Sequence, residues 1–131
     1  MLSNRIAVVT GGGSGIGAAT VAAFVRENIA GIAIVDYNYE SACKVAEAIG
    51  EIAFPVKCDV SQYDQVQEAA KQILEHFGRI DILVNNAGIT RDAMFHKMSM
   101  EQWHKVIDTN LNGAVYWTYA LINPMRKQEY G

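Results

Sequence analysis

The stretch TGGGSGIG at residues 10–17 decides the fold. It follows the short apolar run IAVV at residues 6–9 and leads into small and apolar residues at helical spacing up to Phe24. This order predicts a strand, a tight turn and the start of a helix. The free N–H groups of a helix N-terminus suit an anion, and glycines let a ligand approach the backbone closely. The stretch therefore predicts a site for the pyrophosphate of a dinucleotide.

A second feature of dinucleotide binding is an acidic residue after the next apolar run. Asp36 follows residues 32–35 and stands nineteen positions after Gly17, about where an acid binds the ribose in dinucleotide folds. The alternative interpretation of Asp36 is a solvated carboxylate at a strand end. A P-loop is disfavoured, because Ala18 and Ala19 stand where Lys and Ser/Thr would be needed.

The rest of the chain alternates between strand-like and helix-like segments. Apolar runs at residues 52–56 and 80–84 predict two further strands, and Pro55 assigns the first of these to a sheet edge, because proline cannot donate a ladder hydrogen bond. Helices between successive strands require parallel pairing with right-handed crossovers. We therefore predict an α/β fold: a Rossmann-like doubly wound parallel sheet with strand order 3-2-1-4.

The expected helix boundaries follow from capping signals. Ser61 is a predicted N-cap for a helix that ends at Gly78, and Ser99 with Gln102 forms a predicted capping box for the last helix. We expect that last helix to be interrupted at Gly113 and Pro124. Tyr116, Trp117 and Tyr119 fall outside its apolar stripe, which makes them candidates for contacts with absent strands or another subunit.

Composition excludes several classes of protein. The 131 residues carry a net charge of -3 with both signs interspersed, which argues against a nucleic-acid partner. Cys43 and Cys58 are too few for a disulfide framework, and His76, His96 and His104 lack metal-ligand spacing, so no metal site is expected. Neither a signal peptide nor an apolar run of membrane-spanning length is present. We expect a cytoplasmic protein of one domain, with no membrane partner.

Several motifs together resemble one family, the short-chain dehydrogenases/reductases. The resemblance covers the whole chain, and its motifs are TGGGSGIG at residues 10–17, CDV at 58–60, NNAG at 85–88 and DTNL at 108–111. Within the family, ITRD at residues 89–92, followed by Lys97-Met98 and Trp103, is most similar to the 3-oxoacyl-ACP reductases and the acetoacetyl-CoA reductases.

The resemblance implies a nicotinamide cofactor and assigns its contacts. The pyrophosphate contacts are Gly11, Ser14, Gly15, Ile16 and Gly17; the ribose contact is Asp36; the adenine contacts are Asp59 and Val60; the nicotinamide-ribose contacts are Asn86, Ala87 and Gly88. The charge of Asp36 should repel the 2′-phosphate of NADP, so NAD is the preferred cofactor and NADP a possible one, although many related oxoacyl reductases use NADPH.

One residue is implied to be catalytic. Asn110 matches the asparagine of the family's active-site tetrad, which shapes the helix so that a main-chain carbonyl holds a water molecule. The helical pattern alone favours a different interpretation, in which Asn110 is a buried amide whose partners are backbone groups. Both interpretations remain open on the sequence.

The implied reaction is hydride transfer between the nicotinamide and C3 of a 3-oxoacyl thioester carried by CoA or ACP, in a homo-oligomer. The family also uses a serine, and a tyrosine with a lysine four residues later. None of the six tyrosines here has that lysine. We therefore expect residues 1–131 to be the N-terminal, dinucleotide-binding part of a single short-chain dehydrogenase domain, truncated after four strands.

Two other classes are alternatives. A nucleotide-binding module without catalysis would also lack the tyrosine and lysine. An S-adenosylmethionine methyltransferase would share a Gly-x-Gly-x-Gly turn and an acid after the second strand. Thr10 before the turn and NNAG at residues 85–88 argue against the methyltransferase.

Overall fold

The computed structural model describes all of residues 1–131. Its single sheet is parallel, with strand order β3-β2-β1-β4. The strands are β1 (Ile6–Thr10), β2 (Gly31–Asp36), β3 (Ala53–Lys57) and β4 (Ile82–Val84). The predicted order is confirmed, and Pro55 lies in the edge strand β3. The fourth strand begins later than predicted, because the backbone N–H and C=O of Ile80 bond the side chain of Gln128.

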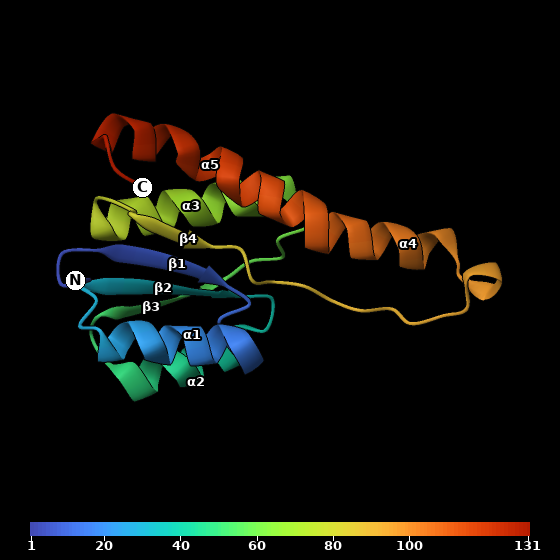
Figure 1. Cartoon of the computed structure of the whole chain (residues 1–131), viewed down its shortest axis with the longest axis horizontal. Helices are drawn as coiled ribbons and strands as arrows, with labels where there is room; N and C mark the ends of the chain where they lie inside the picture. The colour runs from blue at the N-terminus through green and yellow to red at the C-terminus, as the bar shows by residue number, and fades with distance from the viewer.

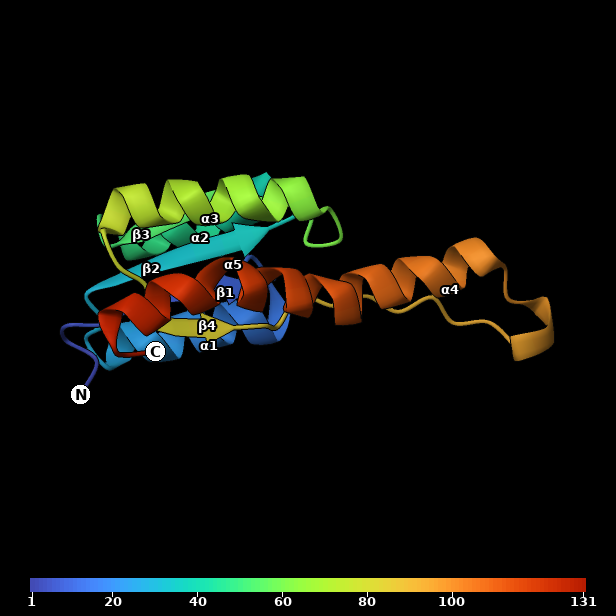
Figure 2. The ribbon, with the colours of Figure 1, turned by 90° about the horizontal axis from the view of Figure 1, so that it is seen from above.

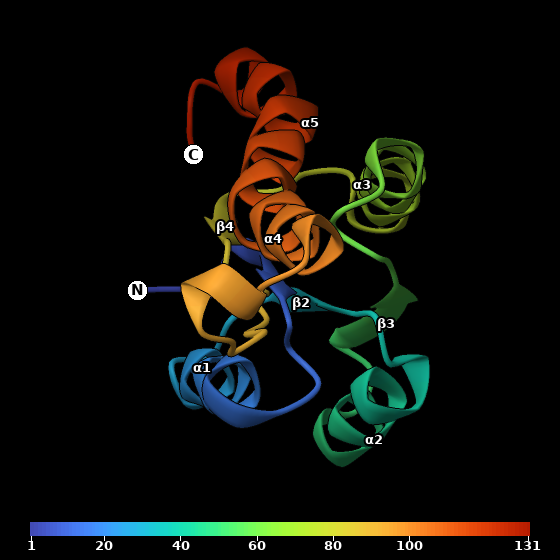
Figure 3. The same cartoon turned by 90° about the vertical axis from the view of Figure 1, so that its right-hand side faces the viewer.

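Helices cover both faces of the sheet, as Figure 1 and the end view of Figure 3 show. On one face lie α1 (Gly15–Arg26) and α2 (Tyr39–Ile49), and on the other lie α3 (Tyr63–Phe77) and α5 (Gly113–Gln128). The strands are buried on both sides, so β1 presents Val8 to one core and Ala7 and Val9 to the other. None of the helices combines the length and the apolar character of a membrane span.

The segment after β4 leaves the body of the molecule. A loop with a 3₁₀ turn at Phe95–Lys97 runs outward, and α4 (Met100–Ile107) returns beside it (Figures 1 and 2). The predicted capping box is confirmed, since the Ser99 hydroxyl accepts from the Gln102 N–H at 3.1 Å and the Gln102 side chain accepts from the Ser99 N–H at 2.9 Å.

The last helix changes its geometry once, just before Gly113, and the predicted interruption at Pro124 was wrong. A π-helical segment, Asp108–Asn112, joins α4 to α5, and α5 continues through Pro124. A π turn holds more residues than an α turn, so the buried face shifts by about one residue after it. Trp117 is therefore fully buried against the sheet and α3. The prediction that Trp117 lies outside the apolar face was wrong for this reason.

The predicted N-cap of α3 was also wrong. Ser61 donates from its N–H and its hydroxyl to Asp59 Oδ1, at 3.0 and 2.7 Å. The helix begins at Tyr63, after Gln62. Ser61 is thus engaged with the preceding carboxylate, which makes a tight local turn in place of a cap.

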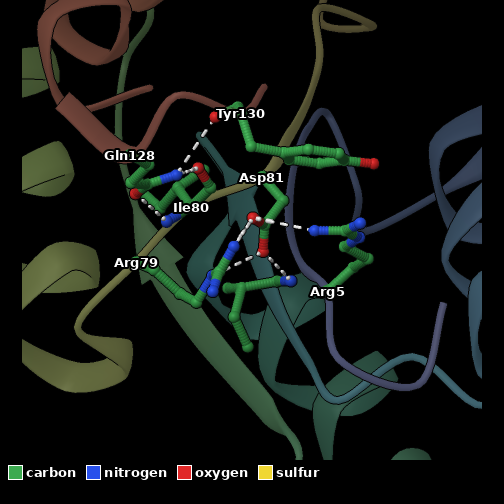
Figure 4. Close-up of polar contacts among 7 residues, drawn as sticks. Arg5, Arg79, Ile80, Asp81, Gln128 and Tyr130 are labelled. Atoms are coloured by element: carbon green, nitrogen blue, oxygen red, sulfur yellow. Dashed lines mark hydrogen bonds and ion pairs between the residues drawn. The ribbon is translucent and has the colours of Figure 1, made fainter. Parts of the chain in front are cut away.

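At the amino ends of the strands, a buried carboxylate joins β1 to β4 (Figure 4). Asp81 accepts from the Ile6 N–H at 2.9 Å and from Arg79, and forms an ion pair with Arg5 at 3.8 Å. Its side chain has no exposed surface. Burial alone would raise the pKa of Asp81, but the hydrogen bonds from Arg79 and Ile6 and the charges of both arginines hold it below its usual value.

The C-terminal end of α5 lies beside this group of residues (Figure 4). The Gln128 amide accepts from the Ile80 N–H at 3.1 Å and donates to the Ile80 C=O at 2.8 Å. The Arg5 guanidinium carbon lies 3.5 Å from the centre of the Tyr130 ring. Both ends of the described chain therefore meet at this edge, on the side away from α4.

Candidate functional site

A cavity of about 510 Å³ opens where the strands end at their carboxyl edge. This is the position at which open α/β sheets bind ligands, beside the point where the strand order reverses. Most of the predicted cofactor contacts line it: Gly11, Ser14, Gly15, Ile16, Asp36, Asp59, Val60, Asn86, Ala87 and Gly88. Gly17 and Asn110 do not line it.

The glycine turn after β1 has the properties of an anion site. Gly11 and Gly15 adopt positive φ angles of 65° and 53°, which side-chain-bearing residues rarely adopt. A Cβ added at Gly15 would meet no atom within 4 Å, so this part of the turn faces open space. Ser14 is the N-cap of α1, but its side chain makes no cap hydrogen bond. The first N–H groups of α1 are thus free of a side-chain cap, as anion binding requires.

Gly17 is required for a different reason. A Cβ at this position would lie 2.0 Å from the Gly11 carbonyl oxygen and 2.6 Å from Asn86 Nδ2. Gly17 is buried, faces the Gly11 carbonyl and the Asn86 amide, and does not itself line the cavity. The structure therefore gives Gly17 a packing role, in bringing α1 close to the strand.

Asp36 is fixed beside the glycine turn by two backbone groups. Its Oδ2 accepts from the Gly13 N–H and its Oδ1 accepts from the Asn38 N–H, both at 2.9 Å. No cation pairs with it. A carboxylate oxygen has further acceptor capacity after one hydrogen bond. Asp36 can therefore still accept hydrogen bonds from the hydroxyl groups of a ligand in the cavity that it lines.

Thr10 and Asn86 join the ends of β1 and β4 next to the cavity. The buried Thr10 hydroxyl accepts from the Asn86 and Ala87 N–H groups at 3.1 and 3.0 Å. The Asn86 side chain donates to the carbonyls of Thr10 and Gly11 at 3.0 and 3.2 Å. These bonds hold residues 85–88 against the glycine turn, and we call them the Thr10–Asn86 joint. This joint fixes the positions of two walls of the cavity relative to each other.

Asn110 lies in the π-helical segment and binds the backbone of a distant loop. Its Oδ1 accepts from the Ile89 N–H at 2.8 Å and its Nδ2 donates to the Ile89 C=O at 2.9 Å. The pattern-based interpretation was right about its backbone partners. It was wrong about burial, since Asn110 is exposed. We call this pair of bonds the Asn110–Ile89 clamp.

Six further residues that the sequence did not assign also line the cavity: Tyr37, Cys58, Ile89, Arg91, Lys105 and Thr109. Tyr37 and Cys58 directly follow β2 and β3, so their positions at strand ends were a usable signal. Arg91 and Lys105 carried no such signal. Burial, with the nearby charge of Asp59, raises the pKa of the Cys58 thiol to about 12, so Cys58 is no nucleophile at neutral pH.

Comparison with known proteins agrees with this geometry. Acetoacetyl-CoA reductase of Paracoccus denitrificans is 43% identical over 127 residues, which are 97% of this chain and 52% of the relative. A 3-oxoacyl-[acyl-carrier-protein] reductase of Thermotoga maritima is 39% identical over 132 residues, 99% of this chain and 54% of the relative. The chain thus spans about half the length of these curated relatives.

A solved structure is also similar over almost the whole chain. The 3-ketoacyl-(acyl-carrier-protein) reductase of Brucella melitensis, complexed with NADH, superposes with a TM-score of 0.93 at 32% identity, covering 98% of this chain and 53% of that one. The family model described as short chain dehydrogenase matches residues 5–131. The chain therefore belongs to the short-chain dehydrogenase family.

Proposed function

We propose that this chain binds NAD(H) for an oxidoreductase that acts on 3-oxoacyl thioesters carried by CoA or ACP. One observation carries the proposal: the uncapped, glycine-rich start of α1 and the carboxylate of Asp36 line the same cavity. The similar proteins support the substrate class, because they are named as acetoacetyl-CoA and 3-oxoacyl-[acyl-carrier-protein] reductases. The NADH complex of a similar structure supports the cofactor class.

In this proposal each wall of the cavity holds one part of the cofactor. The pyrophosphate contacts are Gly11, Ser14, Gly15 and Ile16, with Gly17 allowing the turn to form; Asp36 binds the adenosine ribose; Asp59 and Val60 flank the adenine; Asn86, Ala87 and Gly88 border the nicotinamide ribose. When bound, the nicotinamide would supply or accept the hydride. Asn110 acts as a positioning residue through the Asn110–Ile89 clamp.

The proposed preference for NAD over NADP rests on the charge of Asp36. A unit-charge pair about 4 Å apart is worth roughly 1 kcal/mol in water and about 4 kcal/mol at an effective dielectric near 20. Since about 1.4 kcal/mol corresponds to a tenfold change in affinity, repulsion of the 2′-phosphate should favour NADH at least tenfold. No cation within ion-pair distance neutralises Asp36.

Titration of NADH and NADPH, followed by tryptophan fluorescence, tests this preference. We expect Asp36→Asn to bind NADH more weakly and NADPH more tightly, so that the ratio of the two affinities becomes smaller. Asp64→Asn, which removes the same charge from the first turn of α3, serves as the matched control. Equal affinities for the two nucleotides in the unmodified protein would contradict the proposal.

Turnover is a separate part of the proposal. No tyrosine in residues 1–131 has a lysine four positions later. We propose that turnover needs such a pair elsewhere in the protein, because loss of a general acid typically lowers a rate by about 10²- to 10⁴-fold. Residues 1–131 should then bind NADH without oxidising it in the presence of acetoacetyl-CoA. Oxidation at an ordinary enzymatic rate, about 1 s⁻¹ or more, would contradict this part.

The alternative is a nucleotide-binding protein without catalysis. It differs in one measurement, since the complete protein encoded by the gene would bind NADH but leave acetoacetyl-CoA unreduced. We favour the enzyme because the similar reductases match motifs along the whole of this chain.

We also propose that the protein forms a homo-oligomer through α4 and α5. Large apolar side chains are exposed along these helices and the π-helical segment between them, including Trp103, Leu111, Val115 and Tyr119. Sedimentation of the protein with Val115→Glu should shift it toward the monomer. An unchanged sedimentation coefficient would exclude this face as the interface.

A further inference from the structure

The charged residues that line the cavity differ in how they are bonded. Asp36 and Asp59 lie on the side of the sheet, and both accept hydrogen bonds from backbone N–H groups. Arg91 and Lys105 line the same cavity from the loop after β4 and from α4. Both acids thus already accept hydrogen bonds from the protein. The two cations come from separate segments of the chain, the loop after β4 and α4.

Neither cation has an acidic partner. The ion pairs of the chain join Asp81 to Arg5 and Arg79, and Glu40 to Lys44. Arg91 donates only to the carbonyl of its neighbour Thr90, at 2.7 Å, which leaves most of its five N–H donors free. Glu101, one turn before Lys105 on the same face of α4, is not within ion-pair distance of it.

The Asn110–Ile89 clamp explains why the two cations border one cavity. Arg91 follows Ile89 by two residues, and Lys105 precedes Asn110 by five. The paired bonds between Asn110 and the Ile89 backbone therefore fix the loop after β4 to the π-helical segment that directly follows α4. Thr109, one helical turn after Lys105, lines the same cavity. Figures 1 and 2 show this loop and α4 running beside each other.

We propose that Arg91 and Lys105 form a cation pair that binds a phosphate group of a ligand in the cavity that the glycine turn of α1 also lines. The guanidinium fork of arginine matches phosphate geometry, and the lysine ammonium adds a point charge. This inference rests on the proposed function for the source of the phosphate. That source is either the pyrophosphate of the dinucleotide or a phosphate on the arm that carries the acyl thioester.

The test removes both charges and keeps side chains of similar length. Arg91→Gln/Lys105→Gln is compared with Arg126→Gln/Lys127→Gln, which removes the same charges from exposed positions in the last turn of α5. Calorimetric titration with NADH, coenzyme A and phosphate-free adenosine gives three affinities for each protein. Arg91→Lys/Lys105→Arg keeps both charges, and thermal unfolding shows whether each variant folds.

We expect Arg91→Gln/Lys105→Gln to weaken NADH or coenzyme A binding roughly tenfold, which is about 1.4 kcal/mol. Adenosine affinity should not change, and the loss should shrink at high salt because exposed charges are screened. The charge-conserving variant should keep most of the affinity. A loss confined to NADH identifies the dinucleotide as the source, and a loss confined to coenzyme A identifies the carrier arm.

The proposal is overturned if neither affinity falls further in this variant than in Arg126→Gln/Lys127→Gln. It is also overturned if adenosine binding falls equally, because the effect would then not concern phosphate. Failure of the proposed function has another signature: the unmodified protein would not bind NADH at all. In that case a loss of coenzyme A binding still supports the cation pair.

Discussion

The two ends of the sheet join the same strands, β1 and β4, by different chemistry. At the carboxyl end, neutral groups of Thr10 and Asn86 make the joint, and the cavity beside it leaves the first N–H groups of α1 without a side-chain cap. At the amino end, the buried charge of Asp81 makes the joint, and its partners surround it (Figure 4). We call the amino end, where Asp81 and its partners bond one another, the closed end of the sheet. We call the carboxyl end, where the first N–H groups of α1 have no side-chain cap, the open end.

This difference suggests that the closed end contributes mainly stability and the open end mainly binding. A buried charge is stabilising only with its partners in place, and removal of one partner leaves the others unpaired. An anion site needs donors that the protein does not itself satisfy. Variants at the two ends should therefore separate the free energy of unfolding from nucleotide affinity.

The largest expected effect is at the closed end. Asp81→Ala leaves the Ile6 N–H and two arginines without their shared acceptor, and should lower the free energy of unfolding by about 3 kcal/mol. Asp36→Ala at the open end should cost less, because Asp36 is only half-buried and has no ion pair. Urea denaturation followed by circular dichroism measures both. Equal losses would remove the distinction between the two ends.

The pH dependence of stability sharpens the same contrast. The pKa of Asp81 is lowered in the folded protein, with burial opposed by Arg79, Ile6 and Arg5. Its contribution is therefore fully present above the unfolded pKa, about 3.9, and is lost as pH falls through the lower folded value. Asp81→Asn should be less stable than the unmodified protein at pH 7, and the difference should shrink toward pH 2. A difference that does not depend on pH would exclude this origin.

A smaller effect is expected from the glycines of the open end. Gly17→Ala places a Cβ 2.0 Å from the Gly11 carbonyl oxygen, and only a shift of α1 can relieve this clash. We expect the free energy of unfolding to fall by about 2 kcal/mol and NADH to bind more weakly. Gly15→Ala meets no atom within 4 Å and bears only the strain of φ 53°, about 1 kcal/mol. Denaturation and NADH titration compare the two. If Gly15→Ala were the more destabilising, our packing role for Gly17 would be incorrect.

The open end could largely be predicted from the sequence because its signals are local. A glycine run between a strand and a helix, and an acid directly after the next strand, place residues 10–17 and Asp36 without knowledge of distant contacts. Parallel strands then bring residues 85–88 to the same edge. The sheet order followed from the alternation of elements and from Pro55.

What the sequence did not predict depends on contacts between distant residues or on a change of helical phase. The Asn110–Ile89 clamp joins residues 21 positions apart in the sequence, and the Gln128 side chain bonds Ile80, which is 48 positions away. No periodicity encodes such pairs. The π-helical segment shifted the buried face to Trp117, which a constant 3.6-residue period cannot anticipate. Arg91 and Lys105 line one cavity because the clamp and the π-helical segment bring the loop after β4 and α4 together.

The neutral joint of the open end gives the next prediction. Thr10→Val keeps the shape of the side chain but removes the acceptor of the Asn86 and Ala87 N–H groups. We expect a loss of about 1 to 2 kcal/mol in the free energy of unfolding, together with weaker NADH binding, because residues 85–88 lose their support. Thr10→Ser keeps the hydroxyl and is the control. Full NADH affinity in Thr10→Val would show that this joint does not position the site.

The smallest expected effect concerns the outer layer of the closed end. The Arg5 guanidinium lies over the Tyr130 ring, which is 46% exposed, and exposed cation–π contacts contribute about 0.5 kcal/mol. Tyr130→Leu should therefore lower the free energy of unfolding by about that amount and leave NADH affinity unchanged, whereas Tyr130→Phe keeps the ring and should match the unmodified protein. The two variants differ in aromatic character, so urea denaturation of both isolates the ring's contribution. A loss in Tyr130→Leu as large as that in Asp81→Ala would mean that the ring shields the buried carboxylate from water, and the closed end would then depend on its cover as much as on its charge.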